Sequence, residues 1–266
     1  MPALAYLEPR TLWAVAPVQL YFSYCAGVLT HNQTHSPVFR GRRWNRVYEL
    51  WLSLFYGCPT FVWIPTHLEN HHRYSNGDGD VTQTTRRARK NTLLAALSYP
   101  FHAARWQWPL IQSYAVQARV RGGALWLRVV GETATVVFGQ LSLCSLALAL
   151  HGLGLGALVY VLAVGLPAAL SPAFMMLTNY LQHVDCEPGS PHDHSRNFVN
   201  PWFNWLVFDN GYHTVHHDRP GLHWSRLREA HQARARGIEP HLNQDSPLSY
   251  GWLEYVAGVR HVRHVR

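Results

Sequence analysis

Histidine is the residue type whose number and spacing stand out in this sequence. There are 18 histidines in 266 residues, more than the 15 acidic residues together. Half of them, with one asparagine, fall into four groups with HxxxH, HxxxHH, NxxxH and HxxHH spacing. The members are His31 and His35; His67, His71 and His72; Asn179 and His183; and His213, His216 and His217. Residues four apart share one helix face, roughly 6 Å apart, so each such pair can offer two donors to one metal ion.

The number of donors indicates a site with two ions. An octahedral ion accepts about six ligands, so ten donors exceed what one metal takes. Adjacent histidines point about 100° apart on a helix, which suits a doublet to two neighbouring ions. A hydrolytic zinc site needs only about three protein ligands. Imidazole also binds Cu, Fe and Ni, and a histidine-rich, two-metal, membrane-associated pattern favours iron that activates O2.

The prediction of a metal site depends on the four groups together, because a single HxxxH is more often a surface or core feature. The other histidines are therefore treated separately. His192, His194 and His223 are interpreted as loop residues or as partners of ligands. No role is assigned to a last set, which consists of His102, His151, His231 and His241, and the repeat at 256–266 is interpreted as a basic tail.

Apolar segments must position these groups. Segments 11–30, 130–150 and 154–178 are predicted as membrane-spanning helices, since a bilayer core needs about 20 apolar residues. The last two are joined by an uncharged turn around the letters HGLG, which predicts a transmembrane hairpin. Segments 48–66 and 91–115 are predicted as interfacial helices. The first three histidine groups each follow such an apolar stretch.

The basic residues predict the orientation of the chain. The net charge is +8, and arginines cluster after the first span, between 73 and 90, and before the hairpin, whereas the hairpin turn has none. The positive-inside rule places these arginine-rich segments in the cytoplasm. Arginines that flank membrane spans so regularly do not favour nucleic-acid binding. All four histidine groups then meet on one membrane face only if segment 48–66 does not cross the bilayer.

The isolated cysteines exclude two other kinds of site. Cys25, Cys58, Cys144 and Cys186 form no CxxC pair, so thiolate metal binding and a disulfide framework are not expected. The ligating histidines would instead need oxygen acceptors for their second ring N–H. Asp78, Asp80, Asp185 and Asp209 lie near the histidine groups and are candidates, or are solvated loop acids. Trp63, Trp202, Trp205 and Trp224 fit either an acyl tunnel or a membrane interface.

In combination, the histidine motifs resemble those of the membrane fatty acid desaturase and hydroxylase superfamily, from about residue 31 to 227. The resemblance implies that the three histidine boxes and His183 bind a diiron centre, and that Asn179 binds through a water molecule. It implies an all-α integral membrane protein with a single domain over 1–266, in which few transmembrane helices carry a cytoplasmic, histidine-rich helical cap. The HxxxHH spacing of the second box is also seen in hydroxylating relatives. Only one span precedes the first box, where the family usually has two.

The implied activity is O2-dependent oxidation of an unactivated methylene in a lipid. A fatty acyl desaturase that introduces a C=C bond is the leading interpretation. A hydroxylase, an acetylenase or an alkene-forming decarboxylase is the second, and a non-catalytic membrane metal-binding protein is the third. The resemblance implies an acyl-CoA, acyl-ACP or phospholipid substrate.

The resemblance also implies an electron source and a location. Because the sequence has no HPGG haem motif, we expect a separate electron donor, such as ferredoxin, cytochrome b5 or a reductase. We expect a bacterial inner membrane protein whose metal site faces the cytoplasm.

Overall fold

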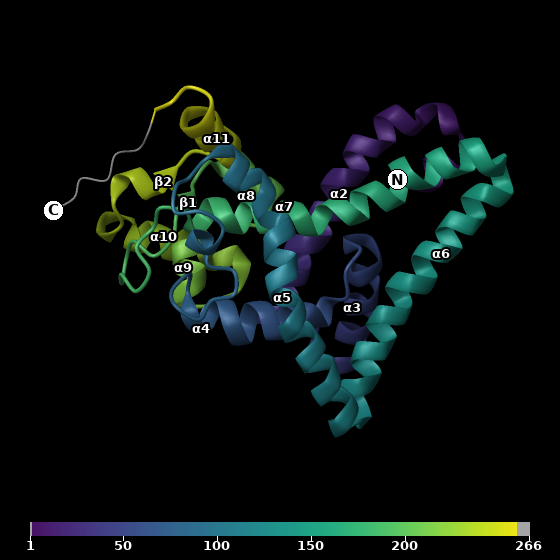
Figure 1. Ribbon diagram of the computed structural model, residues 1–266, viewed down its shortest axis with the longest axis horizontal. Helices are drawn as coiled ribbons and strands as arrows, with labels where there is room; N and C mark the ends of the chain where they lie inside the picture. The colour runs from purple at the N-terminus through teal and green to yellow at the C-terminus, as the bar shows by residue number, and fades with distance from the viewer. Residues whose placement is uncertain (1, 260–266) are drawn as a thin grey trace. The chain divides into compact units, whose positions relative to one another are not determined.

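The computed structural model describes residues 2–259, which fold into helices joined by short turns and, within that range, one pair of two-residue strands (Figure 1). The chain divides into two compact units. The first unit contains Met1–Leu68 and Trp108–Met175, and the second contains Glu69–Gln107 and Met176–Arg266. The unit boundaries fall inside three continuous helices. The predicted tail at 256–266 lies mostly outside the described residues.

Long apolar helices build the first unit. Its main helices are α2 (Leu12–His35), α3 (Arg42–Tyr56) and α6 (Gly123–Tyr160), preceded by the short α1 (Pro2–Leu7) and η1 (Pro9–Thr11). In the part of the chain that the structure describes, two helical stretches are long and apolar enough to cross a membrane, Pro9–His35 and Gly123–His183. The first contains the predicted span 11–30, and the second contains both predicted spans of the hairpin.

The predicted hairpin turn coincides with a break in α6. Gly152 has φ 73°, a left-handed conformation that glycine adopts without steric cost. Beyond this bend, a Cβ on Gly156 would lie 2.5 Å from the carbonyl oxygen of Ala147, so the returning chain packs closely on the outgoing helix. Figure 1 shows α6 running out to this bend and the chain returning toward α7. The return continues through the π-helix η5 (Val161–Gly165) into α7 (Leu166–His183).

Segment 48–66 differs from the single interfacial helix predicted for it. α3 ends at Tyr56, and Gly57 follows with φ 76°. A Cβ at Gly57 would lie 2.4 Å from the Ala168 carbonyl oxygen, so only glycine fits this turn. After Pro59 the chain forms η2 (Thr60–Val62) and then the π-helix η3 (Ile64–His71). The segment is therefore divided into three short helical pieces.

A buried ion network joins α3, α6 and η2 in the first unit. Glu132 has no exposed surface, and its carboxylate accepts hydrogen bonds from Arg46, Arg128 and the Phe61 backbone N–H, at 3.0, 3.0 and 2.5 Å. Glu49 pairs with the same two arginines. Burying a carboxylate costs free energy unless it is paired with a cation. The network therefore holds η2 in place, just before η3, the helix that carries His67.

Aromatic side chains form the main core of the second unit. Tyr99, Tyr180, Phe198 and Tyr250 are fully buried and pack together. The parallel pair β1 (Asn197–Phe198) and β2 (Asn243–Gln244) links segments 46 residues apart. The remaining elements are α4 (His72–Tyr74), η4 (Thr84–Arg86), α5 (Leu93–Arg121), α8 (Pro201–Leu206), α9 (His213–Asp218), η6 (Trp224–Arg226), α10 (Leu227–Arg234), η7 (Ala235–Gly237), η8 (Pro240–Leu242) and α11 (Pro247–Tyr255). Within residues 2–259, none of the four cysteines forms a disulfide bond.

Candidate metal centre

Four of the predicted histidines converge within the second unit. They are His71 at the end of η3, His183 at the end of α7, and His213 and His217 one turn apart on α9. One ligand atom from each lies within 4.8 Å of those of the other three. The Nε2 atom of His213 is 2.8 Å from that of His183 and 3.1 Å from that of His217. Ligands about 2 Å from one ion stand about 3 Å apart, so these separations fit a shared metal.

The outward ring nitrogens of three histidines of this four-histidine set face oxygen atoms. His71 Nδ1 donates to the Asp80 carboxylate at 2.7 Å, and His183 Nδ1 donates to the His194 carbonyl at 3.3 Å. His217 Nδ1 lies 3.3 Å from the Ser75 hydroxyl. A carboxylate or a carbonyl only accepts, so the proton sits on Nδ1 and the lone pair of Nε2 faces inward. Histidines that bind a metal ion typically donate their second ring N–H to an acceptor in this manner.

Asp80 is itself held in place. Its carboxylate accepts the backbone N–H groups of Asn76 and Thr82, both at 2.8 Å, and the Thr82 hydroxyl at 2.6 Å. Burial raises the pKa of Asp80, but the neighbouring His71 and the hydrogen bonds from Thr82 outweigh burial, so its pKa lies well below the usual range. Asp80 therefore stays ionised opposite His71.

The His217 ring of the set is kept neutral. Burial, followed by the neighbouring rings of His213 and His72, lowers the pKa of His217 well below its usual value. Only a neutral imidazole has a lone pair to give to a metal. The unprotonated form that a ligand needs is thus the form that this environment favours.

The other predicted histidines also approach one another inside their own units. In the second unit, His72 Nε2 lies 3.0 Å from His216 Nε2. In the first unit, His35 Nε2 lies 3.0 Å from His67 Nε2, and the His31 ring centroid is 5.0 Å or less from both. The two HH doublets are therefore divided: His71 and His217 join the four-histidine set, whereas His72 and His216 form a separate pair.

The chain that carries these histidines also matches a known protein family. The model of the fatty acid desaturase family matches residues 11–246. The chain belongs to the fatty acid desaturase family. This membership makes it an oxidoreductase of lipid metabolism, and its two apolar helical stretches agree with a membrane setting.

One curated relative carries a more specific description. The chain is 26% identical over 287 aligned residues to a human protein described as a sphingolipid delta(4)-desaturase/C4-monooxygenase. The alignment covers 95% of this chain and 81% of the human protein. No solved structure matched.

Asn179 occupies the place that the sequence predicts, one helical turn before His183 on α7. Its side-chain amide donates to the Tyr99 hydroxyl at 3.4 Å. Tyr99 in turn donates to the Thr82 carbonyl oxygen, at 2.5 Å. Asn179 is thus tied to the loop that holds Asp80, and its water-mediated metal contact stays a prediction.

Of the four candidate acids, Asp80 contacts a histidine of the set, His71. Asp209 instead pairs with Arg228, at 3.3 Å. His194 contributes its backbone carbonyl to His183, and its ring lies 5.6 Å from that of His217. Sequence reasoning did not single out Thr82, Asn76 or Ser75, because small polar residues in a loop carry no signal of their own.

The residues present fit iron. Within the four-histidine set all the donors are imidazoles, a ligand type that binds Fe, Zn, Cu and Ni alike. Three of the four rings face an oxygen partner, and His217 is held neutral.

Proposed function

We propose that this chain is an O2-dependent diiron enzyme that desaturates a lipid acyl or alkyl chain. The observation that carries the proposal is the convergence of His71, His183, His213 and His217, three of them with Nδ1 against an oxygen atom, in a chain of the desaturase family. One iron ion would take these four ligands. Five further histidines stay predicted ligands from the sequence: His31, His35, His67, His72 and His216. Asn179 would act through a water molecule.

The bound iron would supply the chemistry of O2 activation and hydrogen removal from an unactivated methylene. The chain itself supplies orientation. Asp80 and the His194 carbonyl keep His71 and His183 in the tautomer that binds metal. Burial of His183 and His213 keeps bulk water from these rings. The electrons would come from a separate donor, such as ferredoxin, cytochrome b5 or a reductase.

A lipid substrate is supported by the first unit. A pocket of about 250 Å³ there is lined mainly by apolar side chains, among them Leu54, Phe55, Leu143 and Val164. A lipid chain could be delivered as acyl-CoA, acyl-ACP or phospholipid. The description of the human relative as a sphingolipid desaturase adds sphingolipids to the substrates to be tested. We propose an inner membrane location in a bacterium, with the metal site on the cytoplasmic side.

Hydroxylation is the second candidate function. It is favoured by the name of the human relative, which includes both a desaturase and a C4-monooxygenase. The same ligands serve either outcome, because loss of a second hydrogen gives an alkene whereas transfer of oxygen gives an alcohol. Substrate geometry at the metal decides between them.

Mass spectrometry of lipids from a host that expresses the protein tests the proposal. Desaturation removes two hydrogen atoms from a lipid, and hydroxylation adds one oxygen atom. The matched control host expresses His213→Ala, which removes one ligand of the four-histidine set. We expect desaturated lipid with the natural chain and none with the variant. Lipids that are identical in the two hosts would contradict both candidate functions, and would leave the non-catalytic metal-binding alternative.

A further inference from the structure

A short segment of the second unit, Ser195–Asn197, lies between two of the helices that carry the four-histidine set. It belongs to none of the histidine groups. In the chain it follows α7, which ends at His183, and it precedes α8 and then α9, which begins at His213. All three residues are at most 2% exposed. A buried segment of Ser, Arg and Asn must satisfy many polar atoms, so the partners of these atoms reveal what the segment holds.

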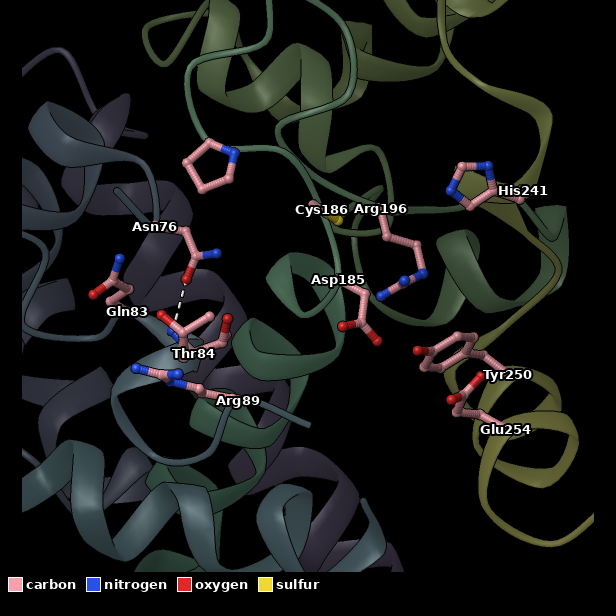
Figure 2. A pocket seen from close by; sticks show the side chains of 12 residues that line it. Asn76, Gln83, Thr84, Arg89, Asp185, Cys186, Arg196, His241, Tyr250 and Glu254 are labelled. Carbon is pink, nitrogen blue, oxygen red and sulfur yellow. Dashed lines mark hydrogen bonds between the residues drawn. The ribbon is translucent and has the colours of Figure 1, made fainter. Parts of the chain in front are cut away.

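Arg196 holds the end of α7. Its guanidinium donates to the Leu181 carbonyl, and its backbone N–H donates to the Gln182 carbonyl at 2.6 Å. The last carbonyls of a helix lack intrahelical partners and carry the negative end of the helix dipole, so a buried cation is well placed there. The guanidinium also lies over the Tyr250 ring, 4.2 Å from its centroid. Figure 2 shows Arg196 extending between Asp185 and Tyr250, at the wall of a polar pocket of about 420 Å³.

Asn197 holds the start of α9. Its side-chain oxygen accepts the Thr214 backbone N–H at 3.0 Å, and its amide donates to the Thr214 hydroxyl at 2.9 Å. The first N–H groups of a helix lack intrahelical acceptors, and Thr214 is the residue that follows His213. Ser195 adds a hydroxyl contact to Thr214 at 3.1 Å. The amide of Asn197 thus binds the first turn of α9, the helix that carries His213 and His217.

We propose that Ser195–Asn197 is the positioning element of the four-histidine set: Arg196 fixes His183 through the end of α7, and Asn197 fixes His213 and His217 through the start of α9. His194, the residue before this element, gives its carbonyl to His183 Nδ1. One segment therefore sets both the position of the helix ends and the orientation of one ring. The inference rests on the proposed function, because it concerns the same metal centre.

Matched variants separate this role from general stability. Asn197→Ser replaces an amide that bonds Thr214 twice with a hydroxyl too short to do so. Asn200→Ser, three residues on, is the control, since Asn200 caps α8 through Trp202 and Phe203, and serine is also a good cap. Arg196→Lys keeps the charge but loses the planar group that stacks on Tyr250 and reaches Leu181.

Amide hydrogen exchange of the metal-free, full-length protein is the first measurement. Asn197→Ser should speed exchange in the peptide covering 212–218, and Arg196→Lys should do so in the peptide covering 180–184. The control should leave both peptides at the rate of the natural chain. Uniform acceleration across the second unit, or no acceleration in the two peptides, would overturn the proposal. This readout needs no metal, so it stands even if the proposed iron chemistry fails.

Iron retention against a competing chelator is the second measurement. Loss of the partners that orient ligands typically weakens metal binding roughly ten- to a hundred-fold, and we expect a change of that size for Asn197→Ser and Arg196→Lys. Asn200→Ser should hold iron as the natural chain does. Retention equal to that of the natural chain in both test variants would refute the positioning role. If the natural chain itself binds no iron, the proposed function fails, and the exchange result alone decides on the positioning element.

Discussion

At the scale of single residues, the atoms that face away from the metal site are as informative as those that face it. Four histidines bring their inner nitrogens together, but histidines can cluster in a core for other reasons. What distinguishes this set is that His71 and His183 each have an outer N–H directed to a pure acceptor. That arrangement fixes the tautomer and points a lone pair inward. These two outer hydrogen bonds are therefore the strongest support for metal binding.

Asp80→Asn tests the partner of His71. The substitution replaces a carboxylate that accepts from His71 with an amide, and it removes the charge that favours a basic imidazole. We expect iron binding to weaken roughly ten- to a hundred-fold, measured by chelator competition on the purified protein. Asp209→Asn is the control, because Asp209 pairs with Arg228 and has φ 55°, a conformation that asparagine tolerates. Equal iron retention in the two variants would show that Asp80 has no part in the site.

His217→Ala and His223→Ala separate a ligand from a bystander. His217 lies within the four-histidine set, whereas His223 is exposed and accepts the backbone N–H of Ser225. The first variant should lose both lipid oxidation and bound iron, because it removes one of the four ligand atoms of the set. The second should retain both. Turnover by His217→Ala at the rate of the natural chain would remove this residue from the site.

At the scale of elements, irregular backbone decides which histidines meet. The spacing HxxxH predicted that His67 and His71 would serve one ion, but they lie in a π-helix, whose hydrogen bonds span five residues instead of four. His67 accordingly joins His35, and His71 joins His183. The helices of His31, His35, His213 and His217 were predictable from the sequence. The π-helix and the break after Tyr56 were not, because they depend on packing against distant residues such as Ala168.

Gly57→Ala tests the turn that ends α3. Alanine at φ 76° costs about 1 kcal/mol or more, and its Cβ would also meet the Ala168 backbone. Gly189→Ala is the control, since Gly189 has φ 82° but nothing within 4 Å of its Cβ position. Thermal unfolding in detergent should show a clearly larger loss of stability for Gly57→Ala. Equal losses would mean that close packing at Gly57 contributes nothing.

Glu132→Gln tests the buried network beneath η2. Removing one partner of a buried ion pair usually costs about 3–5 kcal/mol, and we expect the lower end because Glu49 still pairs with Arg46 and Arg128. Glu229→Gln serves as the control, because its pair with Arg226 is exposed and worth less than about 1 kcal/mol. A melting temperature that is unchanged in Glu132→Gln would contradict the role given to this network.

At the scale of the whole molecule, the family could be predicted from the sequence, whereas the division of the chain into two units could not. Four histidine groups, three of them at the ends of apolar segments, were enough to indicate the desaturase family, which the family comparison confirms. The division into two units was not foreseen, since it depends on contacts between segments far apart in the chain. The role of Ser195–Asn197 was equally hidden, because a polar tripeptide gives no periodic signal. The single-domain prediction and the cytoplasmic orientation stay predictions.

The measurement that tests the central claim most directly is the metal content of the purified, full-length protein. We predict two iron ions per chain, which a strong chelator removes together with all lipid-oxidising activity and which added ferrous iron restores. His183→Ala should hold less iron than the natural chain when prepared in parallel. A natural chain that contains no iron after reconstitution, or that oxidises lipid equally well without it, would contradict the account.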